Sequence, residues 1–274
     1  MPALLRIEDP ADDRIAGYRD IRERDLIGRA GRFVAEGTVV LRLLVDAHAA
    51  GGAFAAESLL LLENRIAGLD DILDRVPDDV PVYVASREVM NAVAGFDIHR
   101  GILALGRRRL TPAIADIVAA LPANALVVAA CGIANHDNIG AIFRNAAAFG
   151  ADAVLLDETC CDPLYRKALR VSVGSVLKLP YARQGTIEAM LSVLAAEGFA
   201  IWGLSPAGTT DIRQIAPTPR LALLTGTEGE GLPPDVMKAI RTARIPQAPG
   251  LDSLNAGTAT GVALFSMASA MGRI

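Results

Sequence analysis

The sequence is poor in the residues that build metal centres and disulfide frameworks. Its 274 residues include only 3 cysteines and 3 histidines. Cys131, Cys160 and Cys161 form an odd set without framework spacing, which favours a reducing, cytoplasmic setting. The histidines are scattered, and a lone pair such as Cys131 and His136 is more often coincidence than ligation. We therefore expect no metal.

The sequence also lacks a strong charge of either sign. The net charge is −4, so the chain as a whole is no polycation, and nucleic-acid binding would need local basic patches. The candidates are the arginines between Arg19 and Arg32, the run Arg107, Arg108 and Arg109, and the group Arg166, Lys167 and Arg170. Taken alone, each patch is more often a solvated helix face.

Long uninterrupted apolar runs are missing as well. The best candidate, residues 256–272, is barely long enough to span a bilayer and is rich in Gly, Thr and Ser, so it predicts a buried helix. No basic segment followed by an apolar one opens the chain, so we expect no signal peptide. The sequence thus predicts no membrane attachment.

The sequence does contain enough apolar residues, over a sufficient length, for two domains with a sizeable core. The composition is 52% hydrophobic, and the mean hydropathy is +0.35. In the first part, short apolar runs alternate with helical patterns, with strands expected at 58–62, 81–85 and 101–106 and helices at 38–49, at 65–75 and after Ser86. This predicts a small α/β domain over residues 1–105, followed by a linker over 106–124 with a short helix.

Residues 125–274 also alternate between strand and helix. Strands are expected at 126–131, 153–156, 200–204, 221–225 and 244–246, and helices at 140–149, 164–173, 187–197 and 254–271. This alternation predicts a mostly parallel sheet that is covered on both faces.

Three unusual segments follow expected strand ends in this second part, where parallel sheets bind ligands. They are "NHDNIGAIFR", "TGTEGEGLP" (225–233) and "PQAPGLDSLN" (246–255). The glycines of the second segment allow close backbone approach, and Glu228 and Glu230 would repel phosphates but tolerate a cationic ligand. The dinucleotide fingerprint G-x-G-x-x-G is absent, which counts against a nucleotide-dependent oxidoreductase.

Two further features concern helices. Ser253 is placed to cap the last helix, whose small residues Ala256, Gly257, Ala259 and Gly261 predict a close contact with another element. Arg144 stands in an otherwise apolar helix, and an unpaired buried guanidinium is costly. Its side chain must therefore reach solvent or meet an anion.

Together the three segments resemble the motifs of the SpoU (TrmH) branch of the SPOUT superfamily of RNA methyltransferases. The matching positions are Asn138, Gly140 and Arg144, then Gly226, Glu228, Gly231 and Leu232, then Ile245, Pro246, Ser253, Leu254 and Asn255. Residues 125–274 carry this resemblance. Two departures are Asn135-His136-Asp137, where relatives have Asp-Pro-Gly, and Gln247, where they have Met.

The first part is similar to the substrate-binding domain of the same family, which has an L30e-like fold. The stretches "FVAEGTVVLRLLVDA" and "HRGILALG" carry this looser match. The resemblance implies an RNA-docking domain over residues 1–105 and a catalytic domain over 125–274 with a trefoil knot, in a homodimer.

The resemblance further implies methylation of a ribose 2′-hydroxyl of ribosomal or transfer RNA, with S-adenosyl-L-methionine as donor. It assigns catalysis to Arg144, Glu228, Ser253 and Asn255, donor binding to Leu204, Gly226, Gly231, Ile245 and Leu254, and RNA binding to Asn138. The clustering of positive charge adds Arg107, Arg108 and Arg109 as expected RNA contacts. The alternative is a non-catalytic RNA-binding relative, against which the intact motif residues argue.

Arg144 could act as a general base or position the RNA. The family's arginine at this position has been proposed as the general base, but an arginine side chain with its ordinary pKa above 12 is a poor base near pH 7. We therefore expect Arg144 to grip an RNA phosphate and to position the 2′-oxygen for reaction.

Overall fold

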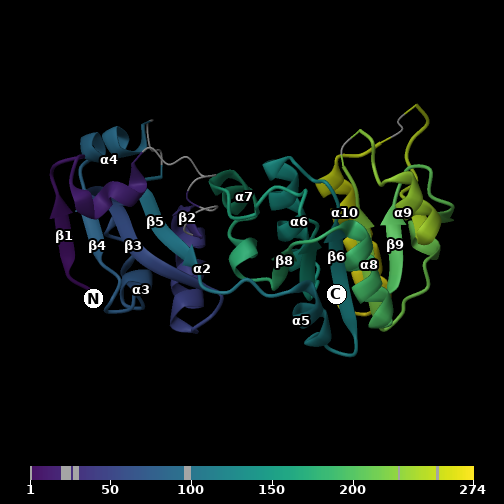
Figure 1. Cartoon of the computed structure of the whole chain (residues 1–274). Coiled ribbons are helices and arrows are strands. Elements are labelled where there is room, and N and C mark those ends of the chain that lie inside the picture. Colours follow the sequence, from purple (N-terminus) through teal and green to yellow (C-terminus); the bar gives the residue numbers. More distant parts are fainter. Residues whose placement is uncertain (1, 20–25, 27–30, 96–99, 228, 251–252) are drawn as a thin grey trace. The chain divides into compact units, whose positions relative to one another are not determined.

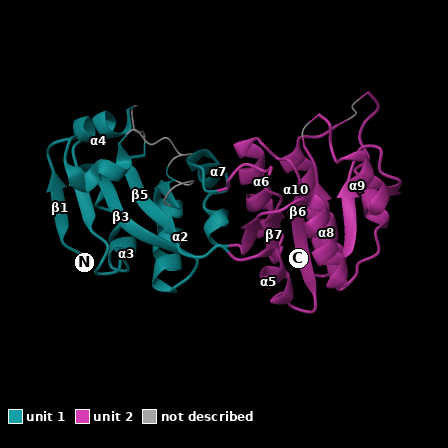
Figure 2. Ribbon diagram, viewed as in Figure 1, with its two compact units in different colours: residues 1–111, 164–178 teal, residues 112–163, 179–274 magenta. Residues whose placement is uncertain are grey.

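The computed structural model of the chain describes residues 2–19, 26, 31–95, 100–227, 229–250 and 253–274 (Figure 1). The chain forms two compact units. Unit 1 consists of residues 1–111 and 164–178, and unit 2 of residues 112–163 and 179–274 (Figure 2). Residues 164–178 thus leave the second part of the sequence and pack within unit 1, which differs from a continuous domain over 125–274. The expected functional boundaries stay a prediction.

Unit 1 is a mixed sheet with short helices. Its elements are β1 (Leu4–Ile7), η1 (Asp13–Tyr18), β2 (Arg32–Glu36), α2 (Thr38–Ala49), β3 (Phe54–Leu62), η2 (Glu63–Arg65), α3 (Asp70–Leu73), β4 (Val82–Ala85), α4 (Arg87–Ala94), β5 (Ile102–Arg108), α7 (Arg166–Val171) and η3 (Ser175–Leu177). The strand order is β1-β4-β3-β5-β2, with β1, β4 and β3 parallel and β5 antiparallel to both neighbours. The L30e-like relation of this unit stays a prediction.

Local sequence signals explain several helix ends in unit 1. The Ser86 hydroxyl accepts a hydrogen bond from the Val89 amide at 3.3 Å, so the predicted cap of α4 is confirmed. Gly95, with φ of 75°, ends the same helix. The helix predicted over 65–75 is mostly turn, because only Asp70–Leu73 is helical.

Unit 2 is built on a seven-stranded sheet. Its elements are α5 (Ile114–Ala119), β6 (Ala125–Ala130), α6 (His136–Ala148), β7 (Ala153–Leu156), β8 (Tyr181–Arg183), α8 (Ile187–Ala196), β9 (Ala200–Leu204), β10 (Thr210–Asp211), η4 (Ile212–Gln214), β11 (Arg220–Thr225), α9 (Pro234–Ala239), β12 (Arg241–Arg244) and α10 (Ala256–Ala270). The order is β10-β12-β9-β11-β6-β7-β8, and all of these pairs are parallel. The predicted α/β class with a parallel sheet is confirmed, and the knot stays a prediction.

The central strand β6 is buried on both faces. Ala125, Val127 and Ala129 pack in a core with apolar side chains of α5, α8 and α9. The alternate residues of β6 are buried on the other face, where α10 packs on the neighbouring strand β11 and on α6. This two-sided burial explains why β6 is an uninterrupted apolar run.

The last helix meets α6 closely, as its small residues predict. A Cβ added at Gly257 would lie 2.6 Å from the Cβ of Ala141, so only glycine permits this approach. The Asn145 side chain donates a hydrogen bond to the Gly257 carbonyl at 2.9 Å. The close contact of the last helix is therefore confirmed.

Several elements were not predicted from the sequence. These are β1, β2, β8, β10 and α9. The expected strand at 244–246 lies earlier, at Arg241–Arg244, where only Ala243 is buried and apolar alternation is lacking. Among helices of the described residues, none combines the length and the apolar character needed to cross a bilayer.

Candidate active site

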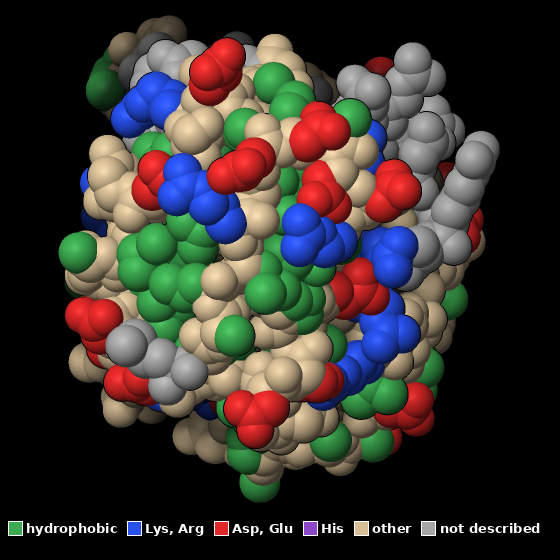
Figure 3. All heavy atoms as spheres, turned by 90° about the vertical axis from the view of Figure 1, so that its left-hand side faces the viewer, with side chains coloured by type: hydrophobic (Ala, Val, Ile, Leu, Met, Phe, Trp, Pro, Cys, Tyr) green, Lys and Arg blue, Asp and Glu red, His purple; other side chains and the backbone are tan. Residues whose placement is uncertain are grey.

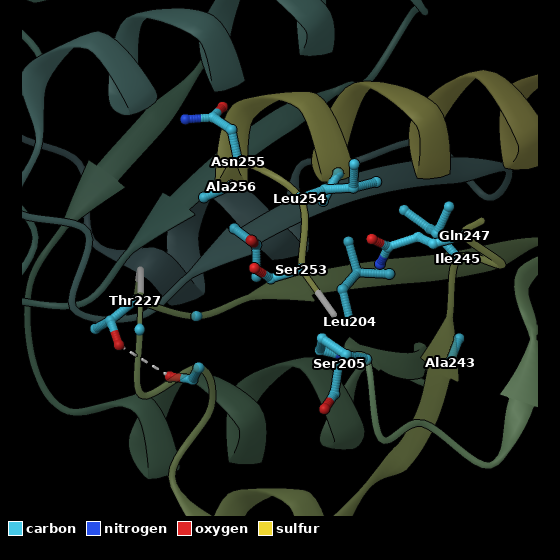
Figure 4. Close-up of a pocket in the computed structure, with 16 residues that line it drawn as sticks. Leu204, Ser205, Thr227, Ala243, Ile245, Gln247, Ser253, Leu254, Asn255 and Ala256 are labelled. Atoms are coloured by element: carbon cyan, nitrogen blue, oxygen red, sulfur yellow. Dashed lines mark hydrogen bonds between the residues drawn. The ribbon is translucent and has the colours of Figure 1, made fainter. Parts of the chain in front are cut away.

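A cavity of about 350 Å³ lies at the carboxyl ends of three neighbouring parallel strands of unit 2 (Figure 4). Because β12, β9 and β11 run in the same direction, the loops that follow them meet at one edge of the sheet. The cavity is lined by Leu204, Ser205, Pro206, Thr225, Gly226, Thr227, Gly229, Gly231, Ala243, Ile245, Gln247, Ser253, Leu254, Asn255, Ala256 and Ala259.

The loop after β11 folds back on itself at the cavity wall. The amides and carbonyls of Thr227 and Gly231 pair in both directions at 3.2 Å. A Cβ added at Gly226 would lie 2.5 Å from the carbonyl carbon of Gly231. The missing side chain of Gly226 therefore makes room for the loop itself, and not only for a ligand.

The amino-terminal end of α10 forms another wall of the cavity. The helix is capped by Asn255, whose side-chain oxygen accepts from the Thr258 amide at 3.1 Å. The predicted cap by Ser253 is therefore wrong, because the chain enters the helix two residues later. Ser253 instead lines the cavity.

Asn255 also connects α10 to α6. Its side-chain nitrogen donates to the side-chain oxygen of Asn138 at 2.8 Å. Asn138 is only 2% exposed, which favours a positioning role, whereas its contact with RNA stays a prediction. This bond joins the first and third sequence motifs at the cavity edge.

The structure brings together all five residues that the resemblance assigned to the donor site. Leu204, Gly226, Gly231, Ile245 and Leu254 all line the cavity, as do Ser253 and Asn255. Their roles in binding and catalysis stay predictions. Glu228 lies outside the described residues.

Arg144 projects from α6 and does not line the cavity. Its side chain is exposed, and within the described part of the chain its guanidinium forms no hydrogen bond or ion pair. Of the two possibilities left open by the sequence, the side chain reaches solvent. It is therefore available to an incoming anion.

The basic run at the end of β5 belongs to unit 1. Arg107 pairs with Glu57 at 3.1 Å, and Glu57 also binds Arg32 at 2.7 Å, so one carboxylate partly neutralises both arginines. Arg109 is exposed and Arg108 is half-buried. RNA binding by this run stays a prediction, and Arg22, Arg24 and Arg29 lie outside the described residues.

The cavity is uncharged along its described lining. No Lys or Arg lies among those side chains, so nothing there would neutralise the phosphates of a dinucleotide. Gln247 stands out because its Oε1 atom is buried and has no hydrogen-bond partner among the described residues. Figure 4 shows its carboxamide reaching toward Leu204 and Leu254. An unpaired buried acceptor is costly, so this atom favours a ligand that carries a hydrogen-bond donor.

Asp157 holds loops near the cavity in place without lining it, and the sequence did not predict this role. It follows β7 and accepts hydrogen bonds from the amides of Gly132 (3.1 Å) and Cys160 (3.0 Å) and from the Thr159 hydroxyl (2.9 Å). Burial alone would raise the pKa of Asp157, but these hydrogen bonds lower it. The only signal in the sequence was an acidic residue directly after a buried strand.

Asp157 holds the start of the loop that leads into α6. A Cβ added at Gly132 would lie 2.5 Å from a methyl carbon of Thr227, so the loops after β6 and β11 touch there. Burial also raises the pKa of Cys131 to about 12, which keeps this thiol neutral. Among the described residues, no cluster of His, Cys, Asp and Glu could hold a metal ion.

Comparison with known proteins agrees with this arrangement. Residues 125–265 match the model of the SpoU rRNA Methylase family. A relative from Mycobacterium bovis, described as an uncharacterised tRNA/rRNA methyltransferase, is 36% identical over 94% of this chain and 89% of its own length.

Two solved structures share the fold over nearly the whole chain. The AdoMet-bound rRNA methyltransferase from Sinorhizobium meliloti is 25% identical with a TM-score of 0.80, covering 96% of this chain and 97% of that one. A protein described as an RNA 2′-O ribose methyltransferase is 25% identical with a TM-score of 0.74, covering 98% and 100%. With the strand-end cavity and the three motifs around it, these matches show that the chain belongs to the SpoU rRNA methylase family.

Proposed function

We propose that the chain transfers the methyl group of S-adenosylmethionine to a ribose 2′-hydroxyl of ribosomal or transfer RNA. The observation that carries the proposal is the uncharged cavity at the ends of β9, β11 and β12, near a helix that presents an exposed arginine to solvent. The names of the relatives support RNA as the acceptor, and one solved structure of the family contains AdoMet.

The residues of the cavity fit this donor. Leu204, Ile245 and Leu254 offer apolar surface to the faces of an adenine ring, and the unpaired Oε1 of Gln247 can accept a hydrogen bond from an amino group. S-adenosylmethionine supplies a methyl group activated on a sulfonium cation. A cavity whose described lining has no basic side chain places no like charge against that cation.

Catalysis then depends on how the chain places the ribose. The reaction joins the ribose 2′-oxygen to the methyl carbon, breaks the carbon–sulfur bond and releases the hydroxyl proton. Arg144 lies six residues, or about 9 Å of helix, beyond Asn138 at the cavity edge. Its planar guanidinium would hold a phosphate next to the reacting ribose, and such positioning lowers the barrier by proximity.

The bond between Asn138 and Asn255 gives this geometry its support. It fixes the start of α6 against the start of α10, which lines the cavity. The helix that carries Arg144 is therefore held in register with the donor site. We assign Asn138 and Asn255 a positioning role on this ground.

The proposal is tested with RNA from a strain that lacks the gene. The purified protein and S-adenosylmethionine labelled on the methyl group are incubated with this RNA, which is then hydrolysed in alkali. Alkaline cleavage needs a free 2′-hydroxyl, so ribose methylation should appear as a labelled, alkali-resistant linkage. Label in mononucleotides would mean base methylation and would contradict the ribose assignment.

The competing reading is an RNA-binding relative without activity. It predicts that RNA binds while no label is transferred and no heat of S-adenosylmethionine binding is detected by calorimetry. Saturable donor binding together with label transfer would exclude it.

A further inference from the structure

A second cavity, of about 450 Å³, lies entirely within unit 1. It is lined by Glu36, Thr38, Val39, Val40, Arg65, Arg100, Ile102, Arg170 and Val173. Three of these residues are arginines, and only one is acidic. The donor site does not account for this cavity, since the two described linings share no residue. Of the described residues that line the second cavity, only Arg170 and Val173 lie within the family match over residues 125–265.

Strand pairing explains why two of the arginines converge. At one end of the sheet, Leu61 of β3 is paired with Ile102 of β5, and the Leu62 amide donates to the Gly101 carbonyl at 2.8 Å. Arg65 follows the end of β3 and Arg100 precedes the start of β5. They are 35 residues apart in sequence and yet line the same cavity.

The third arginine comes from the segment that returns to unit 1. Arg170 lies on α7, which is followed by Val173 with φ of 53°, a conformation that a β-branched residue rarely adopts. At the next position, a Cβ on Gly174 would lie 2.8 Å from a side-chain carbon of Leu43 in α2. Close packing of this turn on α2 therefore holds Arg170 and Val173 at the cavity.

The three arginines are exposed, and their guanidinium groups are not neutralised by the described part of the chain. Within those residues, none of the three forms a hydrogen bond or an ion pair. Other arginines of unit 1 are paired, such as Arg6 with Glu63 at 2.9 Å and Arg42 with Asp71 at 2.8 Å. Three like charges around one cavity repel each other, and an anion between them relieves that repulsion.

A helix end adds to the positive potential. The 12-residue helix α2 begins at the cavity with Thr38, Val39 and Val40, and its N-cap is Gly37, which offers no side-chain oxygen to the first amides. Free amides and the helix dipole at such an end favour an anion. Glu36 is the only acidic side chain in the described lining.

One face of the molecule is shown with its side chains coloured by type in Figure 3. On the face shown in Figure 3, acidic and basic side chains are interspersed, so no continuous basic surface is formed by the residues described there. Near β1 and at the start of η1, opposite charges are paired: Arg6 pairs with Glu8, and Arg14 pairs with Asp12.

We propose that this cavity binds a backbone phosphate of the substrate RNA, with Arg65, Arg100 and Arg170 as its ligands. The choice of RNA as the source of the phosphate rests on the proposed function. A phosphodiester carries one negative charge and several acceptor oxygens, which suits three guanidinium groups and a helix amino terminus. The cavity would anchor RNA on unit 1, apart from the donor site of unit 2.

The test compares two triple variants. Arg65→Gln, Arg100→Gln and Arg170→Gln are combined in one protein, and the paired arginines Arg6, Arg14 and Arg42 are changed to Gln in the control, which loses the same charge. Fluorescence anisotropy measures binding of a labelled single-stranded RNA of about 20 nucleotides without donor, between about 50 and 200 mM salt. Circular dichroism and thermal unfolding check that both proteins, and thus unit 1, are folded, and calorimetry of S-adenosylmethionine binding checks the donor site of unit 2.

We expect the cavity variant to bind this RNA about tenfold more weakly than wild type. The slope of log affinity against log salt should become shallower by about 0.7 for each phosphate that the variant no longer neutralises. The control variant should change both quantities much less, and donor affinity should be equal in all three proteins. Equal RNA affinity and slope in the cavity variant and the control would overturn the proposal.

Glu36→Gln should change the RNA affinity in the opposite direction to the cavity variant. It removes the one carboxylate of the described lining with little change of shape, so we expect RNA affinity to rise about two- to threefold because repulsion is removed. Unchanged or weaker binding would count against a phosphate in this cavity.

Two further outcomes separate related explanations. If inorganic phosphate or uridine 5′-monophosphate binds wild type but not the cavity variant, while RNA affinity is equal in both, the cavity is a free-nucleotide site and the proposal fails. If wild type binds RNA in the cavity but transfers no methyl group, only the proposed function fails. The two proposals are thus tested independently.

Discussion

Arg144 and Gln247 in unit 2 each have a polar group without a partner among the described residues. Arg144 presents its guanidinium to solvent on α6, and Gln247, which lines the cavity, has a buried Oε1. Most buried polar groups in proteins are hydrogen-bonded, so an exception such as Gln247 points to a ligand. We expect the two residues to serve different substrates, the RNA and the donor.

Arg144→Ala should remove most methyl transfer and leave donor affinity nearly unchanged, because the guanidinium lies outside the donor cavity. Arg144→Lys should restore little, since an ammonium cannot bind a phosphate through two parallel hydrogen bonds. Label transfer to RNA and calorimetry with S-adenosylmethionine measure the two effects separately. An alanine variant with full activity would disprove the assigned role.

Gln247→Met should weaken binding of S-adenosylhomocysteine about tenfold, because the ligand's amino group would no longer find a buried acceptor. The decisive comparison uses S-inosylhomocysteine, in which a carbonyl replaces the adenine amino group. Wild type should prefer the adenosine compound, and the variant should show much less of this preference. If both proteins discriminate equally, Gln247 does not contact the amino group.

At the scale of elements, the site depends on contacts between loops and helices that are distant in the sequence. Asp157 ties the loop after β6 to the loop after β7, and Gly257 lets α10 approach α6. Neither residue lines the cavity. Both hold in place the loops and helices that carry the proposed site residues.

Asp157→Asn should destabilise the protein by about 1–3 kcal/mol, because the carboxylate accepts three hydrogen bonds that an amide cannot fully replace. The folded state lowers the pKa of Asp157. Its contribution to stability is thus complete above the ordinary carboxyl pKa of about 4 and disappears as the pH falls toward the lowered value.

Urea unfolding between about pH 3 and pH 7 measures this effect. The difference in free energy of unfolding between wild type and Asp157→Asn should be largest at neutral pH and should shrink in acid. A difference that stays constant with pH would mean that the charge of Asp157 is not what stabilises the loop.

Gly257→Ala should destabilise unit 2 by about 1–3 kcal/mol through overpacking, because the added Cβ would lie 2.6 Å from the Cβ of Ala141. Ser269→Ala, at an exposed position of the same helix, is the matched control. Chemical denaturation measures both. Equal stabilities of the two variants would show that α6 can move away from α10 at little cost.

At the scale of the whole molecule, α10 offers a surface to a second copy of the chain. Its buried face is used within unit 2, whereas Val262 and Phe265 are 41% and 55% exposed. We expect a symmetric dimer, as the resemblance to the family implies and as is commonest among oligomers. The small residues Gly257 and Gly261 contact α6 in this chain, so we do not expect them at the surface of such a dimer.

Phe265→Glu should therefore convert the dimer to a monomer. Static light scattering should give about twice 28.7 kDa for wild type and 28.7 kDa for the variant. Arg170→Gln, at an exposed position of unit 1, should leave the dimer intact. A wild type that is monomeric at working concentration would contradict the dimer itself.

The division of the chain into units makes it difficult to test unit 1 by deleting it. Deleting residues 1–111 would strip residues 164–178 of the strands and helix on which they pack within unit 1. Apolar side chains such as Leu169, which is 1% exposed, would then meet water. Point variants of unit 1 are therefore a cleaner test of RNA docking than truncation.

The sequence by itself determined what depends on local pattern. Alternation of strand and helix predicted the parallel sheet of unit 2. The resemblance carried by the segments after its strands named residues that line the cavity. Side-chain chemistry at single positions also predicted the cap at Ser86 and the tight contact of α10. The short strand β8 was not predicted and β12 was predicted to begin three residues too late, because three or four residues carry little periodicity.

Only the tertiary structure decided which distant residues meet. Residues 164–178 read as part of the second domain and yet pack in unit 1, because their apolar side chains find a partner surface on α2 and β2. The same return brings Arg170 to Arg65 and Arg100, and folding of the α6 and α10 segments brings Asn138 to Asn255. The bond between Asn138 and Asn255 joins positions 117 residues apart, and it arises from packing between elements that no local pattern encodes.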